Sequence, residues 1–344
     1  MKKYDVIIIG CGPAGVAAAK ILINNNINFC MIDKDKFPRK KLCAGGLTNK
    51  CVNLLNELEF NFKNIPYNEI KQLSVRSNNK IYTLNLNDPA ISVDRTQFDN
   101  NNLNYIKKYT DNIFENEQVK EITDSVVITE KDNYEYNYII FADGVNGISR
   151  KYTNKILGFC VESNIKGKTT NDNILLSFDN IKYGYSWIFP KQGFNNIGMG
   201  KFRFLKDNYK EMLIKFCNES NIETKDIKLS GFHIPLFNTK RNLVVDNNKL
   251  LTGDAFGFVD PVTGEGIYYA LLSGKIAAES IVQHINCKNK NLKHIYKKNL
   301  KKVINKLNFR KILNFIFYSS LRSIIIKVLF FNKHTKKFLE KMFN

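Results

Sequence analysis

The sequence has few of the features that build extracellular or metal-binding proteins. Its cysteines number seven, an odd count, and no two of them form a Cys-x-x-Cys pair. The four histidines stand at no spacing typical of a metal site or a catalytic triad. These absences argue against a disulfide framework and against bound metal, and they favour a reducing cytoplasm.

Long uninterrupted apolar segments are also missing. The first residues place two lysines before an apolar run, as a signal peptide does, but Asp5 interrupts that run and glycines follow it. We therefore expect mature structure there. Residues 314–331 are apolar, but Arg322 and Lys327 break this segment, which argues against a transmembrane helix.

Acidic residues are nearly absent from the last part of the chain. Residues 291–344 contain 14 Lys and Arg but a single acid, Glu340, within a chain of net charge +20. Two interpretations remain open for this segment: a basic amphipathic helix on an anionic membrane surface, or a helical cover over a substrate cavity. The sequence has no nucleic-acid-binding module, so we expect no nucleic-acid partner.

The sequence does contain a strand–turn–helix–strand pattern at its start. A β-branched run at Tyr4–Ile9 leads into a glycine-rich turn, an Ala-rich helical stretch at Pro13–Leu22 and a second apolar run that ends at Asp33. Buried parallel strands and a crossover helix have this pattern, so we expect a βαβ unit.

The turn has the Gly-x-Gly-x-x-Gly spacing of a dinucleotide site. The first glycine allows a tight turn, the second lets the backbone approach a pyrophosphate, and the third packs helix against strand. The helix N-terminus adds N–H donors and partial positive charge, and a strand-end carboxylate can accept hydrogen bonds from ribose. The expected binding residues in this unit are Gly10, Gly12, Pro13, Ala14, Gly15, Asp33 and Lys34.

Two downstream motifs favour FAD over NAD. One apolar run ends at Asp143-Gly144, and another ends at Gly253-Asp254 before Gly264 and Gly266 open a helical stretch at Ile267–His284. The ribityl chain of a flavin offers hydroxyls to Asp254, and the start of the helix could face the ring edge that becomes negative on reduction. A dinucleotide site built from three such motifs predicts FAD.

Beyond these motifs, the chain resembles the geranylgeranyl reductase family, flavoproteins with a para-hydroxybenzoate hydroxylase-like fold. "VDRTQFDNNNL" matches the family's Arg-x-x-Phe-Asp pattern, whose arginine, here Arg95, contacts FAD. "YGYSWIFPKQGFNNIGMG" matches its Tyr-x-Trp-x-Phe-Pro-Lys block. The resemblance covers roughly four-fifths of the chain and implies reduction of C=C bonds in an isoprenoid or similarly apolar substrate.

A third matching stretch is "FPRKKLCAGGL", which in the family passes beside the flavin. Lys41, Cys43 and Gly45 fall on its pattern, whereas Ala44 replaces a glycine. The resemblance implies that these four residues contact the cofactor. Cys43 has two interpretations, a ring-side catalytic residue that supplies a proton or a small packed thiol.

The aromatic block suggests where an apolar substrate lies. Tyr185, Trp187 and Phe189 alternate along one strand face, with Pro190 beside them. They form either an apolar wall facing the flavin and the substrate or an ordinary core stripe.

The predicted fold is α/β with α+β elements: a Rossmann-like FAD-binding domain, an inserted antiparallel-sheet substrate domain and a helical C-terminal tail. The predicted boundaries place 1–70, 95–155 and 245–290 in the FAD domain. The substrate domain takes 71–94 and 156–244, and the basic helical segment takes 291–344.

The leading functional hypothesis is an FAD-dependent oxidoreductase of apolar substrates. A flavin monooxygenase of the same fold and a non-enzymatic, membrane-associated flavin redox sensor remain alternatives. The sequence has no second Gly-x-Gly-x-x-Gly, so reducing equivalents would come from transiently bound NAD(P)H or from a redox protein. The expected location is the cytoplasm, with attachment to the inner face of the cell membrane as a further expectation.

Overall fold

The computed structural model describes residues 1–153, 156–166, 172–202, 207–224, 227–238, 242–287 and 291–331. The end of the predicted basic segment, residues 332–344, lies outside these described residues.

One sheet is built around the predicted βαβ unit. Its core strands pair in parallel, and their apolar residues are fully buried, as expected for a parallel sheet covered on both faces. A hairpin partner joins the strand that returns to the sheet, as predicted for residues 126–141. In order, the strands are β15 (Val244–Asp246), β16 (Lys249–Leu251), β9 (Asn133–Phe141), β1 (Lys2–Ile9), β2 (Phe29–Ile32) and β6 (Ile113–Phe114), with β8 (Val126–Thr129) and β7 (Val119–Ile122) attached beside β9.

The second sheet draws its strands from three separate parts of the sequence. Almost all of its pairs are antiparallel, as predicted, but β11 pairs with β4 in parallel because the chain returns there through a long connection. In order, the strands are β14 (Ser230–Leu236), β10 (Ile156–Lys166), β13 (Phe194–Lys201), β12 (Gly184–Lys191), β11 (Asn173–Ser177), β4 (Tyr67–Ser77), β5 (Lys80–Val93) and β3 (Gly46–Leu47).

The helices pack mainly around the first sheet. α1 begins with proline at its first turn, where a missing N–H costs nothing, and α3 is capped by the Asp94 side chain. The helices are α1 (Pro13–Asn24), α2 (Asn49–Glu57), α3 (Arg95–Ile106), α4 (Tyr209–Asn218), α5 (Gly253–Phe256), α6 (Ile267–Asn286), α7 (Leu292–Phe317) and α8 (Arg322–Phe331), with 3-10 turns η1 (Phe62–Asn64) and η2 (Ile148–Tyr152).

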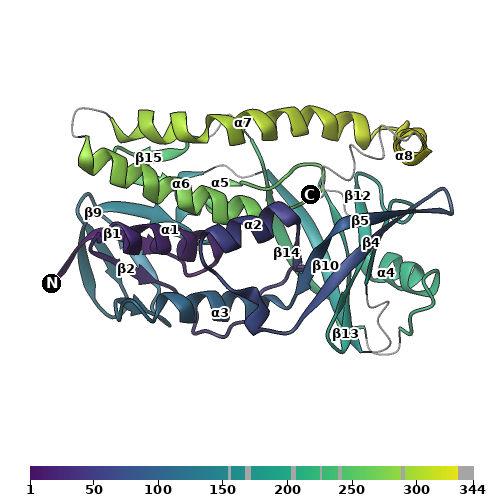
Figure 1. Cartoon of the computed structure of the whole chain (residues 1–344), viewed down its shortest axis with the longest axis horizontal. Helices are drawn as coiled ribbons and strands as arrows, with labels where there is room; N and C mark the ends of the chain where they lie inside the picture. Colours follow the sequence, from purple (N-terminus) through teal and green to yellow (C-terminus); the bar gives the residue numbers. More distant parts are fainter. Residues whose placement is uncertain are drawn as a thin grey trace.

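The tail helices join the two sheets. Figure 1 shows α7 running above α6 along one side of the molecule, with α8 following where the second sheet lies. Tyr318 and Ile326 are buried in the same apolar cluster as residues of β4, β5 and β11. The predicted helical tail therefore packs on the second sheet.

The tail helices also bear on the question of a membrane span. Within the described residues, no single helix has the length and apolar content needed to cross a bilayer. α7 and α8 meet those criteria only as a pair, and the pair is bent by 112°.

Candidate active site

The glycine-rich turn between β1 and α1 is too crowded for side chains at two positions. A Cβ on Gly10 would lie 2.3 Å from the Ala142 carbonyl oxygen, and its φ is +105°. A Cβ on Gly15 would lie 1.9 Å from the Gly10 carbonyl oxygen. At Gly12 the only neighbour is the Arg39 guanidinium at 3.6 Å, so its backbone faces open space. The turn thus leaves room for a ligand at the N-terminus of α1.

Asp33 lies at the end of β2 beside this turn. Its Oδ2 accepts a 2.6 Å hydrogen bond from the Cys11 N–H, and its Oδ1 accepts one of 2.9 Å from the Asp35 N–H. Burial raises the pKa of Asp33, whereas these N–H donors and the nearby Arg39 oppose that rise. The carboxyl is thereby fixed in orientation at the pocket wall.

A buried charge network supports the other side of the turn. Arg95 forms a bidentate pair with Asp99, at 2.9 and 2.8 Å, and Arg39 pairs with the same carboxylate at 3.1 Å. The bidentate geometry fixes the Arg95 guanidinium plane, and a single ion-pair contact holds Arg39 beside the same carboxylate. Arg39, which the sequence interpretation did not select, therefore stands beside Gly12.

These residues border an elongated pocket of about 550 Å³. Most of the predicted cofactor residues line it, namely Gly10, Gly12, Pro13, Ala14, Asp33, Lys34, Lys41, Cys43, Arg95, Asp143, Gly144, Asp254, Gly264 and Gly266. Gly15 and Gly253 instead serve close packing, with Gly253 in a left-handed conformation against Ala14 and Ala270. Ala44 and Gly45 do not line this pocket.

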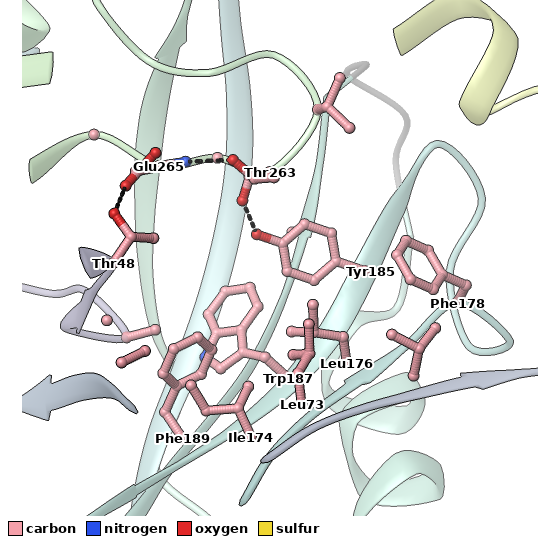
Figure 2. A pocket seen from close by; sticks show the side chains of 18 of the residues that line it. Thr48, Leu73, Ile174, Leu176, Phe178, Tyr185, Trp187, Phe189, Thr263 and Glu265 are labelled. Carbon is pink, nitrogen blue, oxygen red and sulfur yellow. Dashed lines mark hydrogen bonds between the residues drawn. The ribbon is translucent and has the colours of Figure 1, made fainter. Parts of the chain in front are cut away.

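A second cavity of about 390 Å³ lies over the second sheet. Its walls are mostly aliphatic and aromatic, and Figure 2 shows side chains from several strands pointing into it. Tyr185, Trp187 and Phe189 line it as predicted, and so do Ala44 and Gly45, but Pro190 does not. The other strand residues around it include Ile70, Leu73, Val75, Leu84, Ile174, Leu176 and Phe178.

The two cavities share part of their walls. Cys43, Gly264 and Gly266 line both, together with Phe232, Ile234 and Ile267. The polar pocket therefore adjoins the apolar cavity at these six residues. A group bound in one cavity can reach a group bound in the other only across this boundary.

Comparison with known proteins shows what the chain is similar to. Residues 4–173 match the pyridine nucleotide-disulphide oxidoreductase family. An uncharacterised protein of Methanosarcina barkeri is 35% identical over 303 residues, which cover 83% of this chain and 76% of that protein. Digeranylgeranylglycerophospholipid reductase 3 of Methanosphaera stadtmanae is 29% identical, covering 80% of this chain and 77% of that reductase.

A solved structure shares the fold of this chain. The geranylgeranyl bacteriochlorophyll reductase-like protein of Thermoplasma acidophilum superposes with a TM-score of 0.78 at 20% identity, with 99% of each chain covered. This chain belongs to the geranylgeranyl reductase family of FAD-dependent oxidoreductases. It is an enzyme, and its cofactor is FAD.

The polar pocket of this family member fits FAD. The space over Gly12 would be filled by a Cβ, the buried Asp33 carboxylate stands at the strand end, and cationic side chains flank the turn. An open backbone, a fixed carboxylate and nearby positive charge are what a dinucleotide requires. The pocket also takes residues from all three motifs that predict FAD, at Gly12, Asp143 and Asp254.

Two buried ionisable groups of this enzyme hold the Cys43–Gly45 segment. Lys191 donates to the Ala44 carbonyl, to the Ser92 hydroxyl at 2.9 Å and to the Val93 carbonyl at 2.6 Å. Burial lowers the pKa of Lys191 to about 8. The motif lysine thus anchors the segment that separates the two cavities.

Glu162 holds the same segment from another side. Its Oε1 accepts a hydrogen bond from the Cys43 N–H at 3.3 Å, and burial raises the pKa of its carboxyl. Its Oε2 is buried without a hydrogen-bond partner among the described residues. No sequence motif marks Glu162. It meets Cys43 only because β10 folds against the loop that contains Cys43.

The loop before α6 forms the opposite side of the boundary. Thr48 donates to Glu265 Oε1 at 2.6 Å, Lys50 pairs with its Oε2 at 2.5 Å, and the Tyr185 hydroxyl donates to the Thr263 carbonyl. Figure 2 shows the contacts that join Thr48, Glu265, Thr263 and Tyr185 beside the apolar cavity. Of these residues the sequence predicted only Tyr185; it gave no signal for Thr48, Lys50 or Thr263, nor for Glu265, although Gly264 and Gly266 flank that glutamate.

Proposed function

We propose that the enzyme reduces C=C bonds of an isoprenoid, polyprenyl or similarly apolar substrate. The observation that carries this proposal is the apolar cavity, which adjoins the FAD pocket at Cys43, Gly264 and Gly266. Its volume lies within the usual range for small-molecule sites, and its aliphatic walls suit a hydrocarbon chain. The family membership and a relative named for reducing a digeranylgeranyl lipid support the same substrate class.

The chemistry divides between the cofactor and the protein. Reduced FAD, when bound, supplies a hydride for one alkene carbon. The other alkene carbon takes a proton, so that C=C becomes CH–CH. Cys43 is the candidate donor because it lines both cavities, and its Sγ accepts the Gly45 N–H at 3.3 Å within a segment fixed by Lys191 and Glu162.

The roles of individual residues in binding FAD and substrate are also part of this proposal. The FAD contacts come from the pocket residues named above, among them Arg95 and Asp254. Tyr185, Trp187 and Phe189 form the substrate wall, with Pro190 behind it in β12. The two sheets and the tail support a division into an FAD domain, a substrate domain and a basic segment, but β3 and the start of β4 belong to the second sheet although they lie within the range 1–70 proposed for the FAD domain.

The test is a half-reaction. The flavin is photoreduced without oxygen, and its reoxidation is followed after adding geranylgeraniol or, separately, oxygen. Rapid reoxidation by the polyprenyl compound with formation of the saturated product supports the proposal. Reoxidation that requires oxygen, and that the apolar compound accelerates, would instead indicate a monooxygenase. Redox-dependent membrane affinity without turnover would indicate a sensor.

The role of Cys43 has its own test. Cys43→Ser keeps size and polarity but changes acidity, so reoxidation by the alkene should slow by roughly tenfold or more if the thiol supplies the proton. FAD content should stay normal. Equal rates would leave Cys43 as a packed thiol.

We also propose that the enzyme works at the cytoplasmic face of a membrane. Most large apolar side chains that are exposed in the described residues lie between Phe309 and Phe331 on α7 and α8. Ile316 lines the apolar cavity and is 52% exposed, so the cavity reaches the surface among them. Basic residues accompany this face, and anionic lipid attracts such residues.

Liposome binding tests this location. Phe315→Asn should weaken co-sedimentation with anionic vesicles, and high salt should weaken wild-type binding because it screens the lysines. Tyr109→Asn, which changes a comparably exposed aromatic after α3, is the control and should bind as the wild type does. Binding that ignores lipid charge, salt and Phe315→Asn would refute the proposed location.

The electron donor is proposed to be NAD(P)H or a redox protein. The chain has a single Gly-x-Gly-x-x-Gly turn, which supports transient binding of the donor. Anaerobic bleaching of the flavin by NADH, NADPH or a reduced ferredoxin-type protein distinguishes these donors.

A further inference from the structure

α7 is connected to the FAD site by a buried ion pair. Arg310 Nε donates to Asp260 Oδ2 at 2.7 Å, and the two side chains are 10% and 1% exposed. The other oxygen of Asp260 accepts the N–H groups of Val262 and Thr263, at 2.8 and 3.0 Å. Asp260 therefore transmits the position of α7 to the turn that leads into Gly264.

Two further side chains extend this connection. Asn314 donates to the Pro261 carbonyl at 2.5 Å, and Tyr318 donates to the Val262 carbonyl at 2.9 Å. Residues 310, 314 and 318 are four apart, so they form one row along the helix and its end. We call Arg310, Asn314 and Tyr318 the α7 row. Three consecutive residues of the loop are held by this row.

The loop that the row holds is the one that lines the FAD pocket. Gly264 and Gly266 border both cavities, and Gly264 has φ +73°. The Gly264 N–H donates to the Asp260 carbonyl at 2.9 Å, so the turn is closed on the residue that Arg310 grips. A shift of α7 would therefore move the backbone facing the flavin.

The same part of α7 also lines the apolar cavity. Leu313, Ile316 and Phe317 border it, between and beside the residues of the row. Filling the cavity presses on this segment of helix, while the row joins it to the FAD-facing loop. Packed helices shift as rigid units, so a contact on one side of α7 displaces the residues on its other side.

We propose that the α7 row positions the FAD-facing loop and couples the filling of the apolar cavity to FAD binding. The positioning half stands on FAD binding alone, whereas the coupling half rests on the apolar substrate class proposed above. Because coupling is reciprocal, an apolar chain in the cavity tightens FAD by the same factor by which FAD tightens the chain.

The positioning half is tested with Asn314→Leu and Tyr318→Phe, which each remove one donor and keep the packing. FAD dissociation constants, the flavin absorption spectrum and its midpoint potential are measured. We expect dissociation constants about three- to tenfold higher, the usual consequence of losing one such hydrogen bond, together with a shifted spectrum and potential. Arg310→Lys, which keeps the charge beside Asp260, gives a third variant.

Matched controls remove the same groups elsewhere. Asn299→Leu removes an α7 amide that donates to Ser280 at 3.0 Å, away from the loop. Tyr136→Phe removes a hydroxyl that donates to the Thr123 carbonyl at 2.6 Å on the first sheet. Both should leave the potential and the FAD affinity unchanged. If the α7 row had a purely structural role, the row variants and the controls would all have lower melting temperatures. The midpoint potential of the flavin would then stay unchanged.

The coupling half is tested with geranylgeraniol. Its binding is followed by the fluorescence of Trp187, the only tryptophan, and FAD affinity is measured with and without it. We expect tighter FAD binding in the wild type and a smaller effect in the row variants.

Each result has one meaning. Row variants with wild-type FAD affinity, spectrum and potential overturn the positioning. A probe that fills the cavity without changing FAD affinity in the wild type overturns the coupling. A probe that does not bind contradicts the proposed substrate class and the coupling with it, while the row variants still decide the positioning.

Discussion

The FAD pocket and the apolar cavity adjoin each other but are lined by different kinds of chemical groups. The pocket is formed by backbone at strand ends and helix starts, with fixed charges such as Asp33 and Arg95 around it. The cavity is formed by side chains projecting from a sheet and from two tail helices. The first recognises its ligand through hydrogen bonds at set positions, whereas the second recognises size and lack of polarity.

This difference governs what each region tolerates. A hydrogen-bonding site loses affinity steeply when one donor, acceptor or close approach is removed. An apolar site loses it gradually with changes in volume, and it discriminates only modestly between similar chains. We therefore expect narrow cofactor specificity and broad substrate specificity in the same enzyme.

The largest expected effect comes from closing the backbone approach in the FAD pocket. A Cβ at Gly12 would meet the end of the flexible Arg39 side chain at 3.6 Å, an ordinary contact, so in Gly12→Val the fold should persist while the ligand space is filled. FAD affinity should fall roughly a hundredfold, about 3 kcal/mol of overpacking. Flavin absorbance after reconstitution measures this, and geranylgeraniol binding to the same variant should survive. Loss of both ligands would show that the two regions are not separable.

Removing one carboxylate from the pocket should have the next largest effect. Asp254→Ala is expected to weaken FAD by about 1.5–3 kcal/mol, the usual scale for a hydrogen bond to a charged group. Fluorescence of released FAD gives the dissociation constant. Unchanged affinity would show that Asp254 does not contact FAD. It would also show that the pocket depends less on fixed charge than we expect.

The boundary between the two regions should respond to pH through Lys191. Its pKa is lowered to about 8 from 10.5 in the folded protein, so between these values the unfolded chain binds more protons than the folded one. Stability from this group therefore rises as pH increases from about 8 to 10.5, by about 3 kcal/mol. In Lys191→Met this rise should vanish from urea unfolding curves measured across that range. An identical slope in the variant would contradict the assignment.

The smallest expected effect comes from filling the apolar cavity. Leu176→Trp should raise KM for a polyprenyl substrate about tenfold, since overpacking of this size costs about 1–2 kcal/mol. FAD content and midpoint potential should stay close to the wild type. Leu176→Met, which conserves volume, is the control. A large loss of FAD in Leu176→Trp would contradict the proposed coupling, in which a filled cavity tightens FAD binding.

The FAD pocket could be predicted from sequence because its parts are local. Gly10, Gly12 and Asp33 lie within one βαβ unit whose spacing fixes their geometry, and Asp143 and Asp254 each follow an apolar run. Strand ends in a parallel sheet meet at one edge, so separate motifs could be assigned to one site. The parallel core and the helix at Ile267 were confirmed for the same reason.

The boundary between the cavities could not be predicted, because no spacing encodes it. Glu162 reaches Cys43 only through the pairing of strands far apart in sequence, and Arg310 reaches Asp260 only after α7 has packed. The sequence also left the tail open between two interpretations. Its helices cover the apolar cavity, and their exposed apolar side chains support the proposed contact with a membrane.

The FAD pocket takes residues from Gly10 to Gly266, and this spread has a consequence for biosynthesis. During translation the first sheet can begin to form early, but β16 and the loop that follows it leave the ribosome only after the whole second sheet. A nascent chain therefore presents an open half-site for much of its synthesis, with apolar strands lacking their last neighbour. Cofactor capture is then a late event that closes the folding of the enzyme, and cells short of flavin should accumulate a chain that chaperones and proteases recognise as unfinished.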